Sequence, residues 1–263
     1  MFVKKGQIEL SPLLDNLLAT LIVNLILVPL LYIHGINLSA GKEIWPFALI
    51  AAVMYSIFYY VLSKGSASTM ISLINAYPIV TIALAIISLH EFPNIYQWAG
   101  IIITLVGIIC ISEQKAQKKS KKNSKIWILW GLLGAFTIGV AEFATKVATL
   151  QVDGFTFTFF VYLMYIPPLL FFLFFDKKGR KFVELRSMSG LFFTCVGIFF
   201  IEGGLISIAL AYQNGLAILV SPIVATNMLI TVLLAVYFLR DKIVAIQKIG
   251  IVLIVIGVSI IGV

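Results

Sequence analysis

Two acidic residues lie inside long apolar segments of the chain, where a charge is costly. Glu142 and Glu202 each sit in a stretch that could cross a membrane. An ionised carboxylate at the centre of a bilayer costs about 3 kcal/mol even on the lenient insertion scale, so such residues usually carry a function or have a partner. We hypothesise that these two carboxyls take part in proton coupling.

The two acids differ in their neighbours. Glu142 precedes Lys146 by four residues, so on a helix the two side chains share a face and can neutralise one another, which weakens the coupling hypothesis for Glu142. Glu202 has no basic residue within a turn, and a buried carboxyl of this kind could bind and release a proton near neutral pH. The alternative is structural: a permanently protonated Glu202 that donates a hydrogen bond to a neighbouring helix. The sequence favours neither reading.

Polar side chains also gather around two prolines inside apolar segments. Because proline has no N–H, Pro78 should free the carbonyl of Ile74, and Pro222 should free that of Ile218. Broken helices of this kind often line substrate sites. The predicted substrate-binding residues are Ser72, Asn75, Tyr77, Pro78, Ser221, Thr226 and Asn227. The alternative is that these groups join helices together and that the prolines, including the pair at 167–168, are simple kinks.

The elements that carry these residues follow from composition. Of the 263 residues, 61% are hydrophobic and 11% are charged, with a mean hydropathy of +1.09, which excludes a water-soluble surface. Within the apolar runs, odd and even positions are both hydrophobic, whereas barrel strands alternate apolar and polar residues. The runs are therefore expected to be helices. At roughly 20 residues per crossing, about nine spans are expected. They are residues 12–33, 44–62, 67–89, 96–111, 126–150, 155–175, 190–212, 217–239 and 245–263.

The basic residues predict the orientation of these spans. All of the 19 lysines and arginines except Lys42 and Lys146 fall on one face of the predicted topology. The positive-inside rule makes that face cytoplasmic and places Val263 outside a multi-pass cytoplasmic membrane protein. The net charge of +8 therefore sets topology, and nucleic acid is not an expected partner. The lysine-rich segment 113–125 is interpreted as a solvated tether, with binding of anionic lipid headgroups as the alternative.

The chain contains an internal repeat. Shifting it by 150 residues aligns residues 65–111 with residues 215–261 without a gap, and the distinctive pairs are Gly65/Gly215, Thr81/Thr231, Gln97/Gln247, Gly100/Gly250, Gly107/Gly257 and the acidic pair Glu91/Asp241. A first repeat at 1–112, the basic linker 113–125 and a second repeat at 126–263 are the predicted domains. Repeats of five helices, an odd number, face opposite ways in the membrane, which is the inverted-repeat design of many secondary transporters.

The first repeat is incomplete. Residues 2–5 match residues 143–146, which lie near the end of the second repeat's first helix, so the chain begins at the tail of a helix. We hypothesise that Met1 is a mis-assigned or alternative start. The predicted fold class is an all-α polytopic membrane protein of two inverted five-helix repeats, with the first helix largely missing.

The chain resembles the EamA-like family of the drug/metabolite transporter superfamily. The resemblance rests on two copies of an apolar helix, the acidic residues Glu91 and Asp241 just past their ends, and a final helix punctuated by glycines. Pro78 also precedes Glu91 by the spacing that this family favours. The resemblance implies ten helices in two inverted repeats and export or exchange of amino acids or other small metabolites. The sequence departs from the pattern in its missing first helix and in Met228, where the second copy would carry the proline.

The predicted function is secondary transport of a small metabolite across the cytoplasmic membrane, with proton coupling as a hypothesis. The alternative is a flippase for an isoprenoid-linked or lipid head group; a non-transporting scaffold would leave the buried acid and broken helices unexplained.

No set of nucleophilic and acid–base residues gathers at one membrane interface, so an enzyme is not expected. Cys110, Cys195, His34 and His90 are isolated, so we expect no metal and no cofactor. The paired glycines, seven residues apart, predict close helix packing within the scaffold or in a homodimer.

Overall fold

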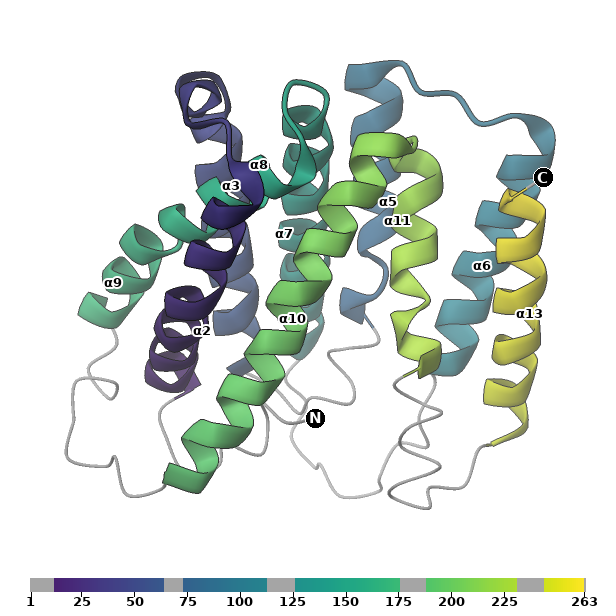
Figure 1. Cartoon of the computed structure of the whole chain (residues 1–263). Helices are drawn as coiled ribbons and strands as arrows, with labels where there is room; N and C mark the ends of the chain where they lie inside the picture. The colour runs from purple at the N-terminus through teal and green to yellow at the C-terminus, as the bar shows by residue number, and fades with distance from the viewer. Residues whose placement is uncertain (1–11, 64–72, 113–125, 176–187, 231–243, 263) are drawn as a thin grey trace. The chain divides into compact units, whose positions relative to one another are not determined.

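A computed structural model describes residues 12–63, 73–112, 126–175, 188–230 and 244–262. All regular secondary structure within these ranges is helical, as the sequence predicts. The elements are α2 (Pro12–Gly35), the 3₁₀ turn η1 (Leu38–Ala40), α3 (Gly41–Ser63), α5 (Tyr77–Leu84), the π-helical η2 (Ala85–Leu89), α6 (Ile95–Ser112), α7 (Ile126–Thr149), α8 (Gly154–Met164), α9 (Ile166–Phe175), α10 (Met188–Asn214), α11 (Ala217–Ala225) and α13 (Ala245–Ile261) (Figure 1).

The helices coincide with the predicted spans over the described residues. Leu38–Phe58, Ile128–Thr149 and Cys195–Asn214 are long and apolar enough to cross a membrane by length and composition. The other apolar helices in the described ranges are shorter. Some of these helices are shorter because turns interrupt three of the expected spans.

Two of the interruptions occupy the same position in the repeat. A turn at Asn75 and Ala76 precedes α5, and a turn at Thr226 ends α11 before the chain becomes helical again at residues 227–230. Ala76 and Thr226 are equivalent under the 150-residue shift. Pro78 follows the first turn, whereas Pro222 precedes the second. The two repeats therefore share the position of the break but not the position of the proline. The third interruption is at Tyr165, between α8 and α9.

Capping explains one of the repeated polar identities, the pair Gln97/Gln247. The side chain of Gln97 accepts a hydrogen bond from the main-chain N–H of Asn94 at 3.0 Å, and Gln247 accepts one from Val244 at 3.1 Å. Each glutamine thereby satisfies an N–H group that the start of its helix, α6 or α13, leaves unpaired. Glu91 caps a helix that is distant in the sequence: its Oε2 accepts a hydrogen bond from the N–H of Ile218, in the first turn of α11, at 3.2 Å.

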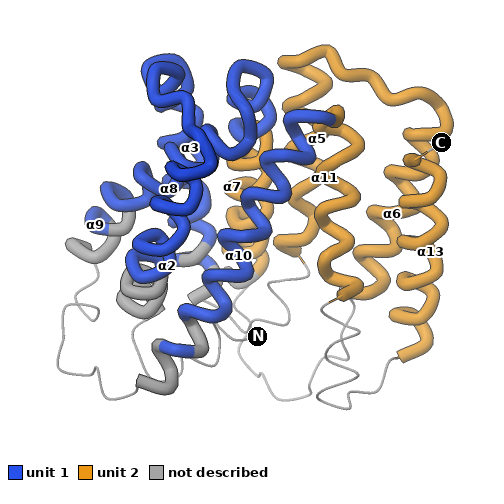
Figure 2. Tube along the Cα trace, in the orientation of Figure 1, with its two compact units in different colours: residues 1–63, 144–214 blue, residues 64–143, 215–263 orange. Residues whose placement is uncertain are grey.

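The chain divides into two compact units, coloured separately in Figure 2. Unit 1 comprises residues 1–63 and 144–214, and unit 2 comprises residues 64–143 and 215–263. Each unit therefore combines helices from both sides of the 113–125 segment, and α7 contributes residues to both. The repeat boundaries at 112 and 126 describe sequence similarity and stay a prediction about domains.

Within unit 2, the repeated glycines pack α6 against α13. A Cβ atom added at Gly100 would lie 2.8 Å from the carbonyl oxygen of Gly257, and one at Gly250 would lie 2.7 Å from that of Gly107. Since Gly100 meets Gly257 while Gly107 meets Gly250, the two helices run antiparallel and the contact is reciprocal between the repeat copies. Side chains at these positions would force the backbones apart, so the glycines serve the scaffold packing that the sequence predicts.

Candidate functional site

The two repeat-equivalent helix breaks come into contact inside unit 2. The side-chain amide of Asn75 donates a hydrogen bond to the sulfur of Met228 at 3.1 Å. Tyr77, Ala225 and Met228 belong to one buried hydrophobic cluster. Residues at or next to each break therefore lie close to residues of the other break. We call Asn75, Tyr77, Glu142, Ser221 and Met228 the break cluster.

Helix α7 brings the acidic member into this cluster. Glu142 is 2% exposed, and its Oε2 accepts a hydrogen bond from Ser221 Oγ at 2.8 Å. One turn earlier, a Cβ atom at Gly139 would lie 2.9 Å from the carbonyl oxygen of Tyr77. The Thr81 hydroxyl donates to the carbonyl oxygen of Gly139 at 3.2 Å. The missing side chain at Gly139 thus lets α7 approach α5 closely and holds Glu142 beside the breaks.

The other residues predicted for substrate binding have different surroundings. Pro78 is buried at the start of α5. The hydroxyl of Thr226 donates to Ile223 of its own helix at 2.6 Å, and Asn227 is exposed. Ser72 lies outside the described residues. Asn75, Tyr77 and Ser221 are the predicted residues that unit 2 gathers with Glu142, and their role in binding stays a prediction.

Two residues that shape the break cluster are not among the site residues predicted from the sequence. Met228 occupies the repeat position of Pro78 and is interpreted above only as a departure from the family pattern. Gly139 is not singled out at all. A usable signal was present: Asn75 is an amide in an apolar span and needs a partner, and the gap-free repeat aligns its neighbourhood with that of Met228.

Glu202 belongs to unit 1 and has a different environment. It is fully buried, and neither of its carboxyl oxygens has a hydrogen-bond partner among the described residues. Its main-chain carbonyl accepts a hydrogen bond from the Tyr162 hydroxyl at 2.6 Å. The side-chain amide of Asn24 donates in turn to the carbonyl oxygen of Tyr162 at 3.2 Å. Asn24, Tyr162 and Glu202 therefore link α2, α8 and α10, the three helices that position this acid.

The basic neighbour of Glu142 is buried as well. Lys146 lies one turn after Glu142 on the continuous helix α7, as the four-residue spacing predicts. Lys146 is 4% exposed, and its Nζ donates to the main-chain carbonyl of Tyr212 at 3.0 Å. The ammonium group thus has a main-chain acceptor within unit 1.

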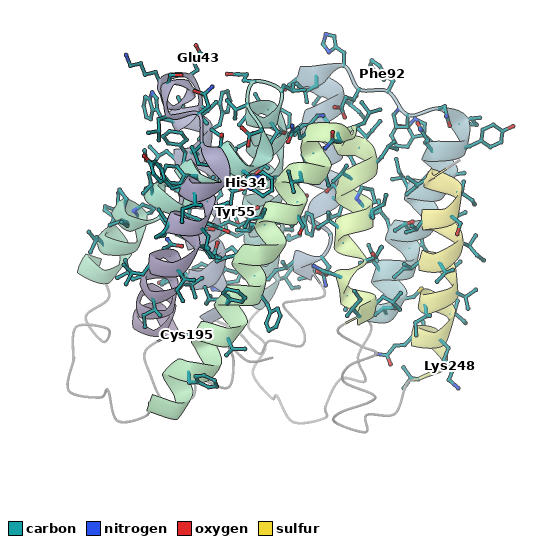
Figure 3. All side chains as sticks on the ribbon, in the orientation of Figure 1. His34, Glu43, Tyr55, Phe92, Cys195 and Lys248 are labelled. Carbon is teal, nitrogen blue, oxygen red and sulfur yellow. The ribbon has the colours of Figure 1, made fainter. Side chains whose placement is uncertain are left out.

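The described part of the chain contains no group of three His, Cys, Asp or Glu residues that could hold a metal ion. Cys110 and Cys195 are not joined in a disulfide. The ring of His34, labelled in Figure 3, packs against that of Phe155 with centroids 4.2 Å apart. The expectation of no metal and no cofactor stays a prediction.

Comparison with known proteins decides the family. The model of the EamA-like transporter family matches residues 1–113 and 125–263, nearly the whole chain. The chain belongs to the EamA-like transporter family. The resemblance proposed from the glycines and the acidic residues past the helix ends is confirmed, and the EamA-like chain is a membrane protein of a family that transports small solutes.

Individual relatives of the EamA-like chain carry little functional detail. It is 34% identical over 116 residues to an uncharacterized protein of Methanocaldococcus jannaschii, a match that covers 42% of the EamA-like chain and 84% of the relative. It is 33% identical over 79 residues to an uncharacterized transporter of Synechocystis sp., covering 30% of the EamA-like chain and 23% of that protein. A crystal structure of a protein with 13% identity aligns with a TM-score of 0.78 over 98% of the EamA-like chain and 89% of its own length, which shows a shared fold.

Proposed function

We propose that the EamA-like chain is a secondary transporter that moves a small metabolite, such as an amino acid or a related solute, across the cytoplasmic membrane by export or exchange. The observation that carries the proposal is the meeting of two helix breaks at repeat-equivalent positions, joined by the Asn75–Met228 hydrogen bond. Discontinuous helices place main-chain polar groups inside an apolar fold, where a solute can bind them. The break cluster is the proposed substrate site.

The inverted repeat is part of the proposal. Support comes from α6 and α13, which are repeat-equivalent helices yet run antiparallel and contact each other through the same glycines in exchanged order. A two-fold relationship between copies produces contacts of this reciprocal kind. Such a relationship offers a transporter two similar states, open to opposite sides of the membrane.

Proton coupling is proposed at the buried acids. Glu142 has the Ser221 hydroxyl as a donor, which stabilises an ionised carboxylate. Glu202 has no hydrogen-bond partner for its carboxyl among the described residues, so the protonated state is the less costly one there in the absence of a ligand. We therefore favour Glu202 over Glu142 as the group that takes up and releases the proton.

The membrane and its orientation complete the proposal. The basic residues support placement in the cytoplasmic membrane with the lysine-rich loops inside and the C-terminus outside. The proposed partners are a small solute and membrane lipid, without nucleic acid, and a homodimer is compatible with the chain. On this proposal the protein is not an enzyme.

The test is solute flux in proteoliposomes. A radiolabelled panel of amino acids and other metabolites would be offered with and without a pH gradient to the present chain and to an upstream-extended version. We expect saturable flux that responds to the gradient. Absence of flux from both forms, in protein shown to be folded, would refute the proposal.

A further inference from the structure

The proposed substrate site is closed in this structure. Every member of the break cluster is at most 8% exposed. A solute can reach these side chains only if one of the helices that cover them moves. The contact that opens must hold α5 or α11 in the closed state and must break at low cost.

The start of α11 takes its cap from another segment. Helix α11 begins after Leu216, whose apolar side chain cannot accept a hydrogen bond, and Ala217 and Ile218 are fully buried. The first N–H groups of a helix have no partner within it, and burial keeps these residues from water. Glu91 Oε2 supplies the acceptor for the N–H of Ile218 at 3.2 Å. A carboxylate at this end of a helix is also attracted by the helix dipole, which strengthens the bond.

The backbone just before Glu91 is irregular. Helix α5 continues into the π-helical η2, which ends at Leu89, and His90 then adopts the left-handed conformation with a φ of 54°. Among the residues that the structure describes, His90 is the only non-glycine residue with a positive φ. π-Helical turns and left-handed residues of this kind are uncommon and concentrate at functional positions. Here they place Glu91 beside the start of α11.

The Glu91 contact joins two half-helices that run antiparallel. Helices α5 and α11 pack against each other (Figure 1). Glu91, past the end of α5, meets the start of α11, whereas Tyr77 at the start of α5 shares a buried cluster with Ala225 at the end of α11. Ser221 of the break cluster lies on α11 between these two contacts. A shift of α11 away from α5 would therefore uncover the break cluster.

Breaking the Glu91 contact costs less than breaking the inner ones. Glu91 is half-buried, so water can solvate its carboxylate when the N–H of Ile218 moves away. Ser221 and Glu142 are almost completely buried, so separating them would deprive a buried carboxyl of a donor. In the proposed orientation, the connection from η2 to α6 lies on the outer side of the membrane. The Glu91 contact is therefore the natural point of opening toward the outside.

We propose that the Glu91 carboxylate and the N-terminus of α11 form a latch that keeps the break cluster closed to the outside and opens once in each transport cycle. Glu91 is a positioning residue in this mechanism, because it holds α11 and does not touch the solute. The inference rests on the proposed transport function, since it assigns the opening step at that substrate site. The competing account is a permanent helix cap that takes no part in opening.

Thiol accessibility of the full chain in lipid nanodiscs tests the latch without a solute. Cys110 and Cys195 are first replaced by alanine, and a thiol is introduced by Ala225→Cys, at a fully buried position on α11. The probe is a charged methanethiosulfonate reagent. We expect slow labelling with Glu91 intact and labelling about fivefold faster or more after Glu91→Ala, which removes the cap. Glu91→Gln should lie between the two, because it retains an acceptor oxygen.

Two controls separate opening of the latch from a general loss of stability. Gln97→Ala removes the side-chain acceptor at the start of α6, at the same end of unit 2, and should leave the labelling rate at position 225 unchanged. The thiol of Thr104→Cys lies at the buried contact of α6 with α13. It should be labelled equally slowly with and without Glu91→Ala, because that contact does not include α11.

Solute flux gives a second readout, measured with the member of the radiolabelled panel that the chain transports fastest. Loss of the latch raises the population open to the outside, so Glu91→Ala should lower the half-saturating concentration of external solute severalfold. The maximal rate should fall as well, because the cycle also needs the closed state. A permanent cap would lower only the amount of active protein and leave the half-saturating concentration unchanged.

Several results would overturn the latch. They are an unchanged labelling rate at position 225 in a folded Glu91→Ala protein, equal acceleration at Thr104→Cys, the same acceleration after Gln97→Ala, or an unchanged half-saturating concentration. If Glu91→Ala does not fold, Glu91→Gln takes its place and should be labelled about twofold faster or more, since it lacks the charge; an unchanged rate there refutes the latch. Accelerated labelling in a chain that transports no solute would keep the latch contact and refute transport. Flux of a solute with unchanged labelling would do the reverse.

Discussion

Ser221 Oγ donates a hydrogen bond to Glu142 Oε2 at 2.8 Å, and both side chains are almost completely buried. The bond joins α11 to α7 next to the break at Thr226. A hydroxyl–carboxylate bond of this kind is among the stronger side-chain interactions, because one partner can carry a full charge. The pair therefore links the scaffold of unit 2 to its proposed substrate site.

Removing the hydroxyl should expose the dependence of Glu142 on its donor. We expect Ser221→Ala to lower the free energy of unfolding by about 1–3 kcal/mol, since a buried carboxyl loses the donor Ser221 Oγ. Thermal unfolding in detergent measures the change. The matched control is Ser207→Ala, because the Ser207 hydroxyl is exposed and donates to the carbonyl of Gly203 in its own helix. Equal effects of the two substitutions would contradict the role given to the pair.

The α6–α13 contact should not tolerate a methyl group. A Cβ atom at Gly257 would overlap the hydroxyl oxygen of Thr104 and lie 2.8 Å from the carbonyl oxygen of Gly100. Gly257→Ala should therefore destabilise the fold by about 1–3 kcal/mol or more through overpacking. Gly203→Ala, in α10 with open space at its Cβ, should be neutral or stabilising by up to about 1 kcal/mol. Chemical or thermal unfolding of the two variants side by side decides the point.

Thr104 offers the opposite prediction. Its hydroxyl oxygen is buried without a hydrogen-bond partner among the described residues. Thr104→Val keeps the shape and removes that polar atom, so we expect stability to be unchanged or higher by about 1 kcal/mol. Thr137 is the comparison, because its buried hydroxyl donates to Gly134 at 3.0 Å, and Thr137→Val should lose stability instead. Unfolding curves in which both variants shift the same way would argue against this account.

Glu91 should stabilise the start of α11. Glu91→Ala leaves the N–H of Ile218 without its side-chain acceptor and removes a negative charge from a helix N-terminus, so stability should fall by about 1 kcal/mol. Glu91→Gln keeps an acceptor oxygen and should recover part of the loss. A Gln variant as unstable as the Ala variant would mean that the charge, rather than the hydrogen bond, is responsible.

Glu202 is the proposed coupling group, and its charge can be removed with little change of shape. In Glu202→Gln, we expect flux that no longer responds to a pH gradient, because the side chain cannot exchange a proton. Proteoliposome flux at several pH differences across the membrane measures this. A variant that keeps full, gradient-dependent flux would exclude Glu202 from the coupling mechanism.

The candidate sites were only partly predictable. A polar residue inside an apolar span can be recognised from the sequence alone, because burying it is costly. This applies to Glu142, Glu202, Asn75 and Ser221. Their partners could not. Met228 and Tyr162 are ordinary apolar or aromatic residues in sequence, and they become relevant only where folding brings them against Asn75 and Glu202 across more than a hundred and about forty residues, respectively.

The sequence by itself determined the helical class, the spans, the repeat and the family, because these follow from hydropathy and from residue identities that recur along the chain. It also indicated that the paired glycines serve close packing. The tertiary structure decided what each glycine touches, where the helices break, and that each compact unit combines helices from both sides of the linker. The physical reason is that hydropathy is local and nearly uniform in this chain, whereas hydrogen-bond partners and backbone contacts depend on which helix faces meet.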